Sequence, residues 1–340
     1  MLIPSHNLLI EESCKQLLRT EGGICSASEK GFFSFLIYSR YERYESYLFK
    51  FCFYCSNFEK IYENGGKEFL QSEFKDFTFS LNEEIEKIKF SLCIDINLEK
   101  YKKAYERIPF RMGVEEKEKL IKEKQTCKNE LEIFIKSVSE KLSKFRINLY
   151  SYVIKHFLIM YKEKKSQNSF SLNLNKTNIL HIVPSDNSTD FANLIYCLNF
   201  NEPYEQLLCD LFLKEFKSKK NADKKLFTVD LYFKSLEIPD KIKAIDDVSK
   251  YSNGFVVFNV SLKNENELSN YLTFFVTFRD YIQKYIKFTK IMLRKAIKEK
   301  GKDFKEKYDK LHNKYLEDPE CKKLATSLFR DGIAKDLKNI

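Results

Sequence analysis

The stretch from Asn264 to Lys300, NENELSNYLTFFVTFRDYIQKYIKFTKIMLRKAIKEK, decides the fold class, because it predicts one long helix. Asn264 and Glu267 have the spacing of a capping box at the start of that helix. Side chains of one stripe then recur every three or four residues, as an amphipathic helix requires. The stripe consists of Leu268, Leu272, Phe275, Phe278, Ile282, Tyr285, Thr289, Leu293 and Ile297. No helix breaker occurs before Gly301, so we expect a rod of about 35 residues and about 50 Å, longer than one small domain needs.

The second half of this rod concentrates positive charge. Between Lys284 and Lys310, eleven basic residues stand against four acidic ones, which accounts for most of the chain's net charge of +10. The basic residues are Lys284, Lys287, Lys290, Arg294, Lys295, Lys298, Lys300, Lys302, Lys305, Lys307 and Lys310. One interpretation is a solvated helix face, and the other is a docking surface for a polyanion or an acidic protein.

Upstream of the rod, strand patterns recur at short intervals with turn-forming residues between several of them. They cover 168–174, 177–183, 191–200, 206–216, 225–234 and 253–262. Few of them have the long helical spacers that parallel crossovers need, so we expect a meander of antiparallel strands. Apolar residues with helical spacing over 129–161 predict a long helix that opens this second domain.

The N-terminal part of the chain has a similar pattern. An aromatic run over 45–54 predicts a buried strand, and a helix that opens at residues 56–57 should bend at Gly65-Gly66. Residues 85–99 predict a further strand. The Glu- and Lys-rich residues 115–128 have little apolar stripe and indicate a solvated helix or an insertion.

Composition argues against several classes of protein. With 43% apolar and 32% charged residues, the 340-residue chain can form a large core. No run approaches the ~20 apolar residues of a membrane span, and the first residues lack signal-peptide order, so we expect a soluble intracellular protein. Nine scattered cysteines indicate reduced thiols without a metal site. Nine glycines and four histidines form no phosphate-binding or catalytic motif, so we expect no enzyme and no cofactor.

A run in the rod resembles a known family. Thr277-Phe278-Arg279-Asp280-Tyr281-Ile282, continued by Tyr285-Ile286-Lys287 and Thr289-Lys290, is similar to the C-terminal helix of the 34-kDa subunit (subunit 2) of the actin-related protein 2/3 (Arp2/3) complex. That complex nucleates branched actin filaments. Four further segments are similar in the same order, namely Asn7 with Ile10–Ser13, Phe58–Leu70, Lys144–Glu163, and Phe212–Lys217 before a basic loop. The Glu- and Lys-rich region near 101–128 departs from the family as an insertion.

The resemblance implies an α+β fold of two similar antiparallel-sheet-plus-helix domains followed by a long C-terminal helix. We place the first domain at 1–105, a charged insertion or linker at 106–128, the second domain at 129–262, and the long helix and tail at 263–340. The resemblance also implies a non-catalytic core subunit that scaffolds the actin-related proteins and contacts the mother filament. The implied partners are the 20-kDa subunit (subunit 4), actin-related proteins 2 and 3 and the actin filament, in the cytoplasmic actin cytoskeleton or the nucleus, without a membrane.

Resemblance and charge together assign two sets of residues. The predicted filament-binding residues are Lys217, Lys219 and Lys220 in a loop over 217–225, and Lys287, Lys290, Arg294, Lys295 and Lys298 on the rod. The predicted interface with the partner subunit comprises Phe275, Phe278, Ile282, Tyr285 and Ile286, packed partly on the chain's own sheet. We further expect the insertion at 103–128 to be dispensable for folding.

Two alternatives stay open. The basic helix is also compatible with a nucleic-acid-binding protein, although the strands show no aromatic platform for bases and the helix is not a known groove reader. The chain is also compatible with a divergent scaffold that acts on another polymer.

Overall fold

The computed structural model describes fourteen stretches of the chain. They are 7–19, 23–29, 33–41, 47–55, 57–85, 87–106, 108–109, 111–165, 168–175, 178–185, 190–198, 202–223, 227–233 and 254–317. Contacts divide the chain into two compact units, residues 1–282 and 283–340, and the last helix belongs to both.

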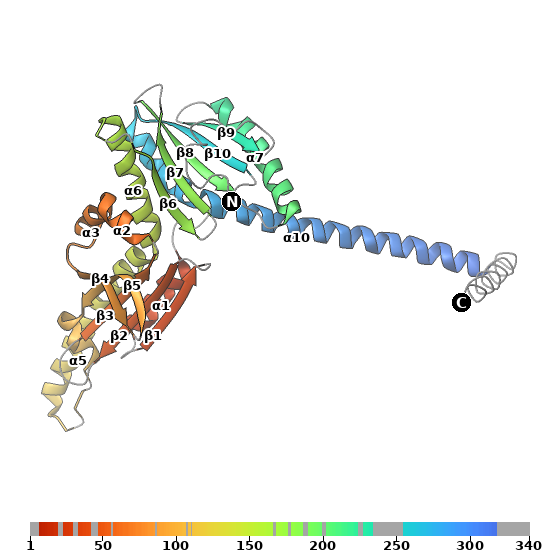
Figure 1. Cartoon of the computed structure of the whole chain (residues 1–340). Helices are drawn as coiled ribbons and strands as arrows, with labels where there is room; N and C mark the ends of the chain where they lie inside the picture. The colour runs from red at the N-terminus through yellow and green to blue at the C-terminus, as the bar shows by residue number, and fades with distance from the viewer. Residues whose placement is uncertain are drawn as a thin grey trace. The chain divides into compact units, whose positions relative to one another are not determined.

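Two five-stranded antiparallel sheets form the framework of the first unit (Figure 1). Sheet A contains β1 (Gly23–Glu29), β2 (Phe33–Tyr41), β3 (Tyr47–Tyr54), β4 (Thr78–Ile85) and β5 (Ile88–Asn97), in the order β1-β2-β3-β5-β4. Sheet B contains β6 (Phe170–Asn175), β7 (Asn178–Pro184), β8 (Phe191–Leu198), β9 (Phe227–Phe233) and β10 (Gly254–Ser261), in the order β6-β7-β8-β10-β9. Every pairing in both sheets is antiparallel.

The helices repeat in the same way around the two sheets. In sheet A the helices between the third and fourth strands are α2 (Phe58–Ile61), η1 (Tyr62–Gly66) and α3 (Lys67–Glu73), and in sheet B the helix there is α7 (Pro203–Asp223). The helices before each sheet are α1 (Leu8–Arg19) and α6 (Phe145–Lys162). After sheet A come η2 (Glu99–Tyr101), α4 (Lys102–Tyr105) and α5 (Val114–Ser143), and after sheet B comes α10 (Glu265–Glu317). The predicted α+β fold with two antiparallel sheets and a long C-terminal helix is confirmed.

Helix α6 packs on both sheets. Near its start, the Phe145 ring meets Phe53 of β3 with centroids 5.1 Å apart. Near its end, Phe157 stacks on Phe170 of β6 at 4.0 Å, and the Tyr161 hydroxyl donates a hydrogen bond to the Ile182 carbonyl at 3.0 Å. One helix therefore contributes to two aromatic cores, each worth several kcal/mol of apolar burial.

The first turns of α10 cover one face of sheet B. Phe278 packs edge-on against Phe258 at 4.8 Å and against Tyr196 at 5.2 Å. The Tyr196 hydroxyl also donates a hydrogen bond to the Phe275 carbonyl. Phe275 in turn meets Phe227 of β9 at 5.5 Å. The apolar stripe predicted for the rod thus completes the core of sheet B up to Ile282, which is fully buried.

Three local predictions are wrong. Residues 206–216, expected as a strand, lie in α7, and this helix continues to Asp223 through most of the expected 217–225 loop. The buried side chains of α7, Cys209, Phe212 and Leu213, are spaced three to four residues apart, and Pro203 occupies the first helical position, where proline is favoured. The segment has the helical period rather than the period of two that a strand requires.

The other two errors concern helix ends. The helix expected over 129–161 is two helices, because the backbone turns at Lys144 between α5 and α6. The last helix passes Gly301 and ends at Glu317, so it has 53 residues and a length of about 80 Å. A single glycine in an exposed helix costs only about 1 kcal/mol relative to alanine, which is too little to end it.

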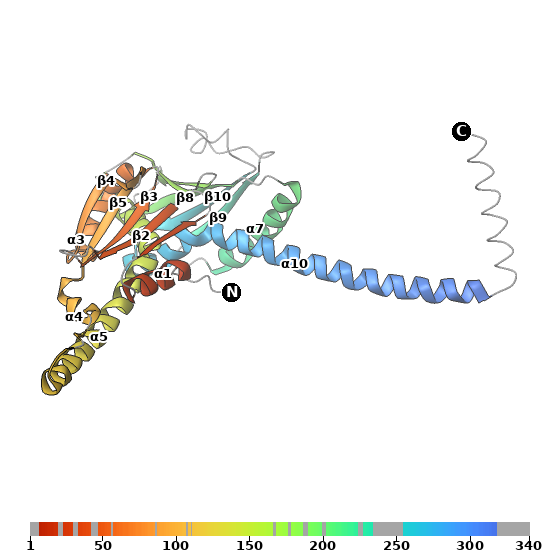
Figure 2. The same cartoon turned by 90° about the horizontal axis from the view of Figure 1, so that it is seen from below.

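Several other local features agree with the sequence. The bend at Gly65 is present, since Gly65 has a φ of 102° inside the helical segment. The Glu- and Lys-rich region is the exposed first half of α5, and α1 and α5 lie side by side (Figure 2). The predicted division into 1–105, 106–128, 129–262 and 263–340 stays a prediction.

Candidate functional site

The run that carries the resemblance, Thr277–Ile282, lies in the buried part of α10. Arg279 is only 5% exposed, and burial lowers the pKa of its guanidinium to about 10, so it remains a cation at neutral pH. Asp280 forms an ion pair with Arg146 of α6, with 3.3 Å between Oδ2 and Nη2. The run therefore holds α10 to its own chain, because it combines core packing with a charge pair to a neighbouring helix.

The predicted partner-interface residues occupy the same part of the helix. Phe275 and Phe278 pack on sheet B, and Ile282 is fully buried within the single chain. Ile286 is also buried, and Tyr285 is half-buried. The isolated chain thus already covers most of this set, and its assignment to a partner stays a prediction.

Beyond Ile286 the same apolar stripe continues but is exposed. We call Leu293, Ile297 and Phe304 the partner stripe. They follow Ile286 by seven, eleven and eighteen residues, which at about 100° per residue keeps all of them on its side of the helix. Ile297 is 70% exposed and Phe304 is 72% exposed. Large apolar side chains grouped in solvent are typical of interaction sites.

The predicted filament-binding residues of α10 lie on a neighbouring side of the helix. Lys287, Arg294, Lys298 and Lys305 form one row, which we call the basic ridge, because their spacings of seven, eleven and eighteen residues return to the same angle. All four are exposed. Lys295 lies at one border of the ridge, exposed, and Lys290 at the other, half-buried. The ridge lies about 100° around the helix from the partner stripe.

The predicted filament-binding lysines of α7 have a different setting. Lys217 is half-buried and forms an ion pair with Asp230 of β9 at 3.1 Å. Lys219 and Lys220 belong to the helical backbone of α7, and their side chains lie outside the described residues. Lys217 therefore has a structural partner within its own unit, whereas the ridge residues of α10 face solvent.

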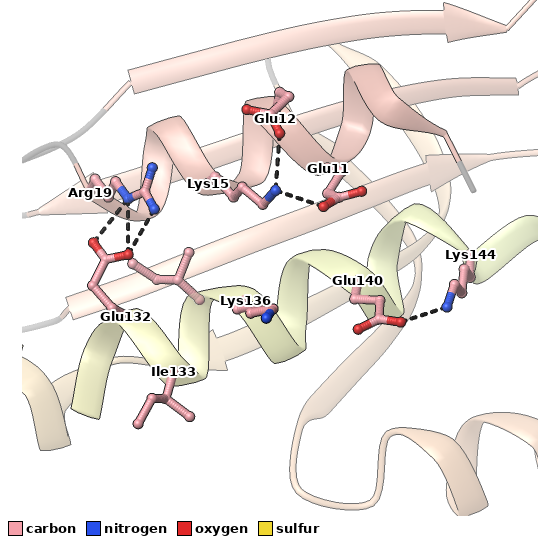
Figure 3. A pocket seen from close by; sticks show the side chains of 10 residues that line it. Glu11, Glu12, Lys15, Arg19, Glu132, Ile133, Lys136, Glu140 and Lys144 are labelled. Carbon is pink, nitrogen blue, oxygen red and sulfur yellow. Dashed lines mark hydrogen bonds and ion pairs between the residues drawn. The ribbon is translucent and has the colours of Figure 1, made fainter. Parts of the chain in front are cut away.

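A groove of about 680 Å³ between α1 and α5 is a feature that the sequence did not indicate (Figure 3). Arg19 donates hydrogen bonds to the Glu132 carboxylate, from Nε to Oε1 at 2.9 Å and from Nη2 to Oε2 at 2.7 Å. This hydrogen bonding lowers the pKa of the Glu132 carboxyl. Lys15 pairs with Glu11 at 2.6 Å and with Glu12 at 3.0 Å. Four carboxylates and four cations line the groove, so it has no net charge, and the Arg19–Glu132 ion pair attaches α1 to α5.

Metal-ligating side chains and buried thiols are the remaining candidates for chemistry among the described residues. Within them, no group of three or more His, Cys, Asp or Glu side chains could hold a metal ion. Cys52 and Cys93 face each other in β3 and β5, and their hydrogen bonding together with burial raises the pKa of Cys52. Burial raises the pKa of Cys209 to about 12. Thiols with raised pKa values are neutral and unreactive at physiological pH.

The hydropathy of the helices gives a further finding. In the part of the chain that the structure describes, no helix is both long enough and apolar enough to span a bilayer.

Comparison with known proteins yields one family. The family model described as "Arp2/3 complex, 34 kD subunit p34-Arc" matches residues 52–312. The matched span begins in β3 and ends in the last turns of α10, so it includes sheet B, the partner stripe and the basic ridge. Curated proteins show no match to this chain.

Proposed function

The chain belongs to the family of the Arp2/3 complex 34 kD subunit, p34-Arc, and on this premise we propose that it is a non-catalytic core subunit that scaffolds the actin-related proteins and contacts the mother actin filament. The observation that carries the proposal is the change along α10. One apolar stripe is buried in the chain's own core as far as Ile286 and continues in solvent as the partner stripe.

The partner stripe is suited to a helix of the 20-kDa subunit, subunit 4. Its members repeat at intervals of four and seven residues, the spacing that packs one helix along another. Fully burying a Leu, Ile or Phe side chain contributes about 1.5–3 kcal/mol. Three such residues therefore support a stable contact, and the buried Phe275, Phe278 and Ile282 would anchor the rod that presents them.

The basic ridge is suited to the acidic surface of an actin filament. Its cations are exposed and lie in one row. Three of the four acidic residues between Lys284 and Lys310 lie about 100° or more from that row, and Asp309 lies about 40° from it, one turn beyond Lys305. Because the ridge is turned away from the partner stripe, subunit 4 and the filament can bind at the same time. The location implied is the actin cytoskeleton.

The test compares two triple variants of equal charge change. Lys287→Gln, Arg294→Gln and Lys298→Gln remove three charges from the ridge, and Lys300→Gln, Lys307→Gln and Lys310→Gln remove three exposed charges elsewhere on α10. Purified complexes are assayed by cosedimentation with filaments in the presence of excess DNA. We expect several-fold weaker binding for the ridge variant and near-normal binding for the control.

Two results would count against the proposal. Equal binding by both variants would show that the ridge is only a solvated face. Loss of filament binding to competing DNA would favour the nucleic-acid alternative. DNA is used as the competitor because added salt weakens binding to filaments and to nucleic acid in the same way.

A further inference from the structure

Two lysines border the partner stripe on the side away from the basic ridge. Lys300 and Lys307 follow Ile297 and Phe304 by three residues each, which places them about 60° around the helix from these two side chains. Both lysines are exposed. When two helices pack along each other, side chains at this position lie beside the apolar seam and select the partner by their charge. The border of the partner stripe is therefore suited to partner recognition.

The acidic residues of this part of α10 lie away from the stripe. Measured from Phe304, all four acidic residues between Lys284 and Lys310 lie at least about 100° around the helix. They are Glu299, Asp303, Glu306 and Asp309. On the other side of the stripe, Arg294 lies about 80° from Phe304 and leads into the rest of the basic ridge. A helix bound to the partner stripe would therefore meet positive charge on both borders.

This arrangement argues against two other occupants. In a second copy of α10 both borders of the stripe are again basic, so parallel and antiparallel pairing would each bring like charges together. A membrane surface takes up a wide apolar face. The three side chains of the partner stripe lie within about 40° of one another, and a stripe this narrow is typical of the seam between two helices.

We propose that the partner stripe receives a helix of another subunit whose own apolar stripe is bordered by glutamate or aspartate side chains, and that these carboxylates lie opposite Lys300 and Lys307. The two lysines are seven residues apart, which is about 10 Å along the axis, so carboxylates with the same spacing would meet both. Lys300 and Lys307 then select the helix, and the apolar stripe supplies the contact. This inference rests on the proposed function, because it adds the charge of the partner to the contact proposed there.

The first experiment joins lysines to the carboxylates that they contact in the assembled complex. The complex is purified with the tagged full-length chain and treated with a water-soluble carbodiimide, which couples an amine to a carboxylate in direct contact with it. Mass spectrometry of the peptides should show Lys300 or Lys307 joined to a Glu or Asp of another subunit, in a segment with apolar residues every three or four positions. Lys300→Arg with Lys307→Arg keeps both charges without an amine, so the complex should assemble and these cross-links should disappear.

The second experiment reverses the charge of the border. Lys300→Glu with Lys307→Glu should lower the recovery of the cross-linked subunit at least about five-fold, because each partner carboxylate would face a like charge. Lys295→Glu with Lys302→Glu is the matched control, since these lysines are also exposed and seven residues apart but lie about 160–180° from Phe304. The control should recover the subunit normally. Lys300→Gln with Lys307→Gln removes the attraction without adding a repulsion, so that complex should still assemble.

Several results would overturn the inference. One is cross-linking of Lys300 and Lys307 only within their own chain, and another is equal recovery by the two reversal variants when circular dichroism shows both to be helical. Cross-links at these lysines between light and heavy isotope-labelled copies of the chain would identify a second copy instead. Binding of the isolated chain to phosphatidylserine vesicles, without cross-links to another subunit, would identify a membrane.

Ile297→Asp distinguishes the failure of this inference from the failure of the proposed function. If Ile297→Asp loses a subunit but the reversal of Lys300 and Lys307 does not, only the acidic border of the partner is refuted. If Ile297→Asp loses no subunit, the contact at the partner stripe is itself refuted, and the proposed function fails with it.

Discussion

The same substitution should have different effects at two positions of the apolar stripe on α10. Ile282→Asp and Ile297→Asp each place a carboxylate on the stripe, fifteen residues apart. Ile282 is fully buried in the single chain, whereas Ile297 is 70% exposed. The first change should therefore act on folding and the second on assembly.

The magnitudes follow from burial. At Ile282 the substitution forfeits about 1.5–3 kcal/mol of apolar burial and adds several kcal/mol for a carboxylate without a buried partner. A total on the order of 5 kcal/mol is comparable to the whole stability of a typical domain. At Ile297 the aspartate stays in water, so the free energy of unfolding should change by less than about 0.5 kcal/mol.

Two measurements separate these effects. Urea unfolding of the isolated chain should show a large loss for Ile282→Asp and almost none for Ile297→Asp. Recovery of the other subunits with the tagged chain should fall sharply for both, whereas Ala296→Asp, an exposed neighbour off the stripe, should assemble normally. If Ile297→Asp is as stable as the parent chain and still recovers every subunit, the partner stripe is not an interface and the reasoning is refuted.

Four further predictions concern stability. Gly65→Ala should cost at least about 1–2 kcal/mol, because Gly65 has a φ of 102° and a Cβ there would lie 3.1 Å from the His156 ring. Gly301→Ala should instead favour local helix by about 1 kcal/mol, since a Cβ there meets nothing within 4 Å. Thermal unfolding and hydrogen exchange, respectively, check these two, and equal effects would contradict them. Arg19→Gln should lower stability by a fraction of a kcal/mol at pH 7, because Glu132 is half-exposed. Arg19 depresses the folded-state pKa of Glu132, so this contribution is present above the ordinary value of 4.5 and is lost as the pH falls through the lower folded value. A difference between variant and parent that persists at pH 2 would contradict the assignment. Replacing the exposed residues 111–119 by a short linker should shift the melting temperature by no more than about 2 °C, and loss of soluble protein would show that this part of α5 is needed.

The segment replaced in the last prediction, 111–119, is shorter than the insertion expected to be dispensable, 103–128. The reason is that residues at the start of that insertion make tertiary contacts. Ala104 is buried, and the Tyr105 hydroxyl donates a hydrogen bond to the Leu18 carbonyl in α1. Lys103 pairs with Glu123 across the turn between α4 and α5 at 2.8 Å. A deletion that begins at 103 would therefore remove core contacts as well as solvated charge.

Elements with a strong local period were the most predictable. The stripe of α10 predicted its helix, and alternation with turn residues predicted strands β6 to β10 within a few residues. Prediction failed at 206–216, where apolar residues are so dense that a strand pattern and a helix pattern both fit. Only packing decides such a segment, and Phe212 and Phe216 of α7 stack at 5.8 Å on one helical side.

The candidate site divides in the same way. The basic ridge depends on residue type and helical spacing alone, so the sequence already placed Lys287, Arg294 and Lys298 together. The predicted partner-interface residues belong to the apolar stripe of the same helix. Apolar spacing alone does not show which turns of that helix pack on the chain's own sheet. Phe278 packs against Phe258 and Tyr196, which precede it in the sequence by 20 and 82 residues.

The sequence by itself therefore determined that α10 is a long helix with an apolar stripe and a basic row, since both follow from a local period of 3.6 residues. Only the tertiary structure decided where along that helix the chain's own core ends. Burial depends on contacts between residues far apart in the chain, and these contacts leave Ile286 inside the protein and Ile297 in solvent.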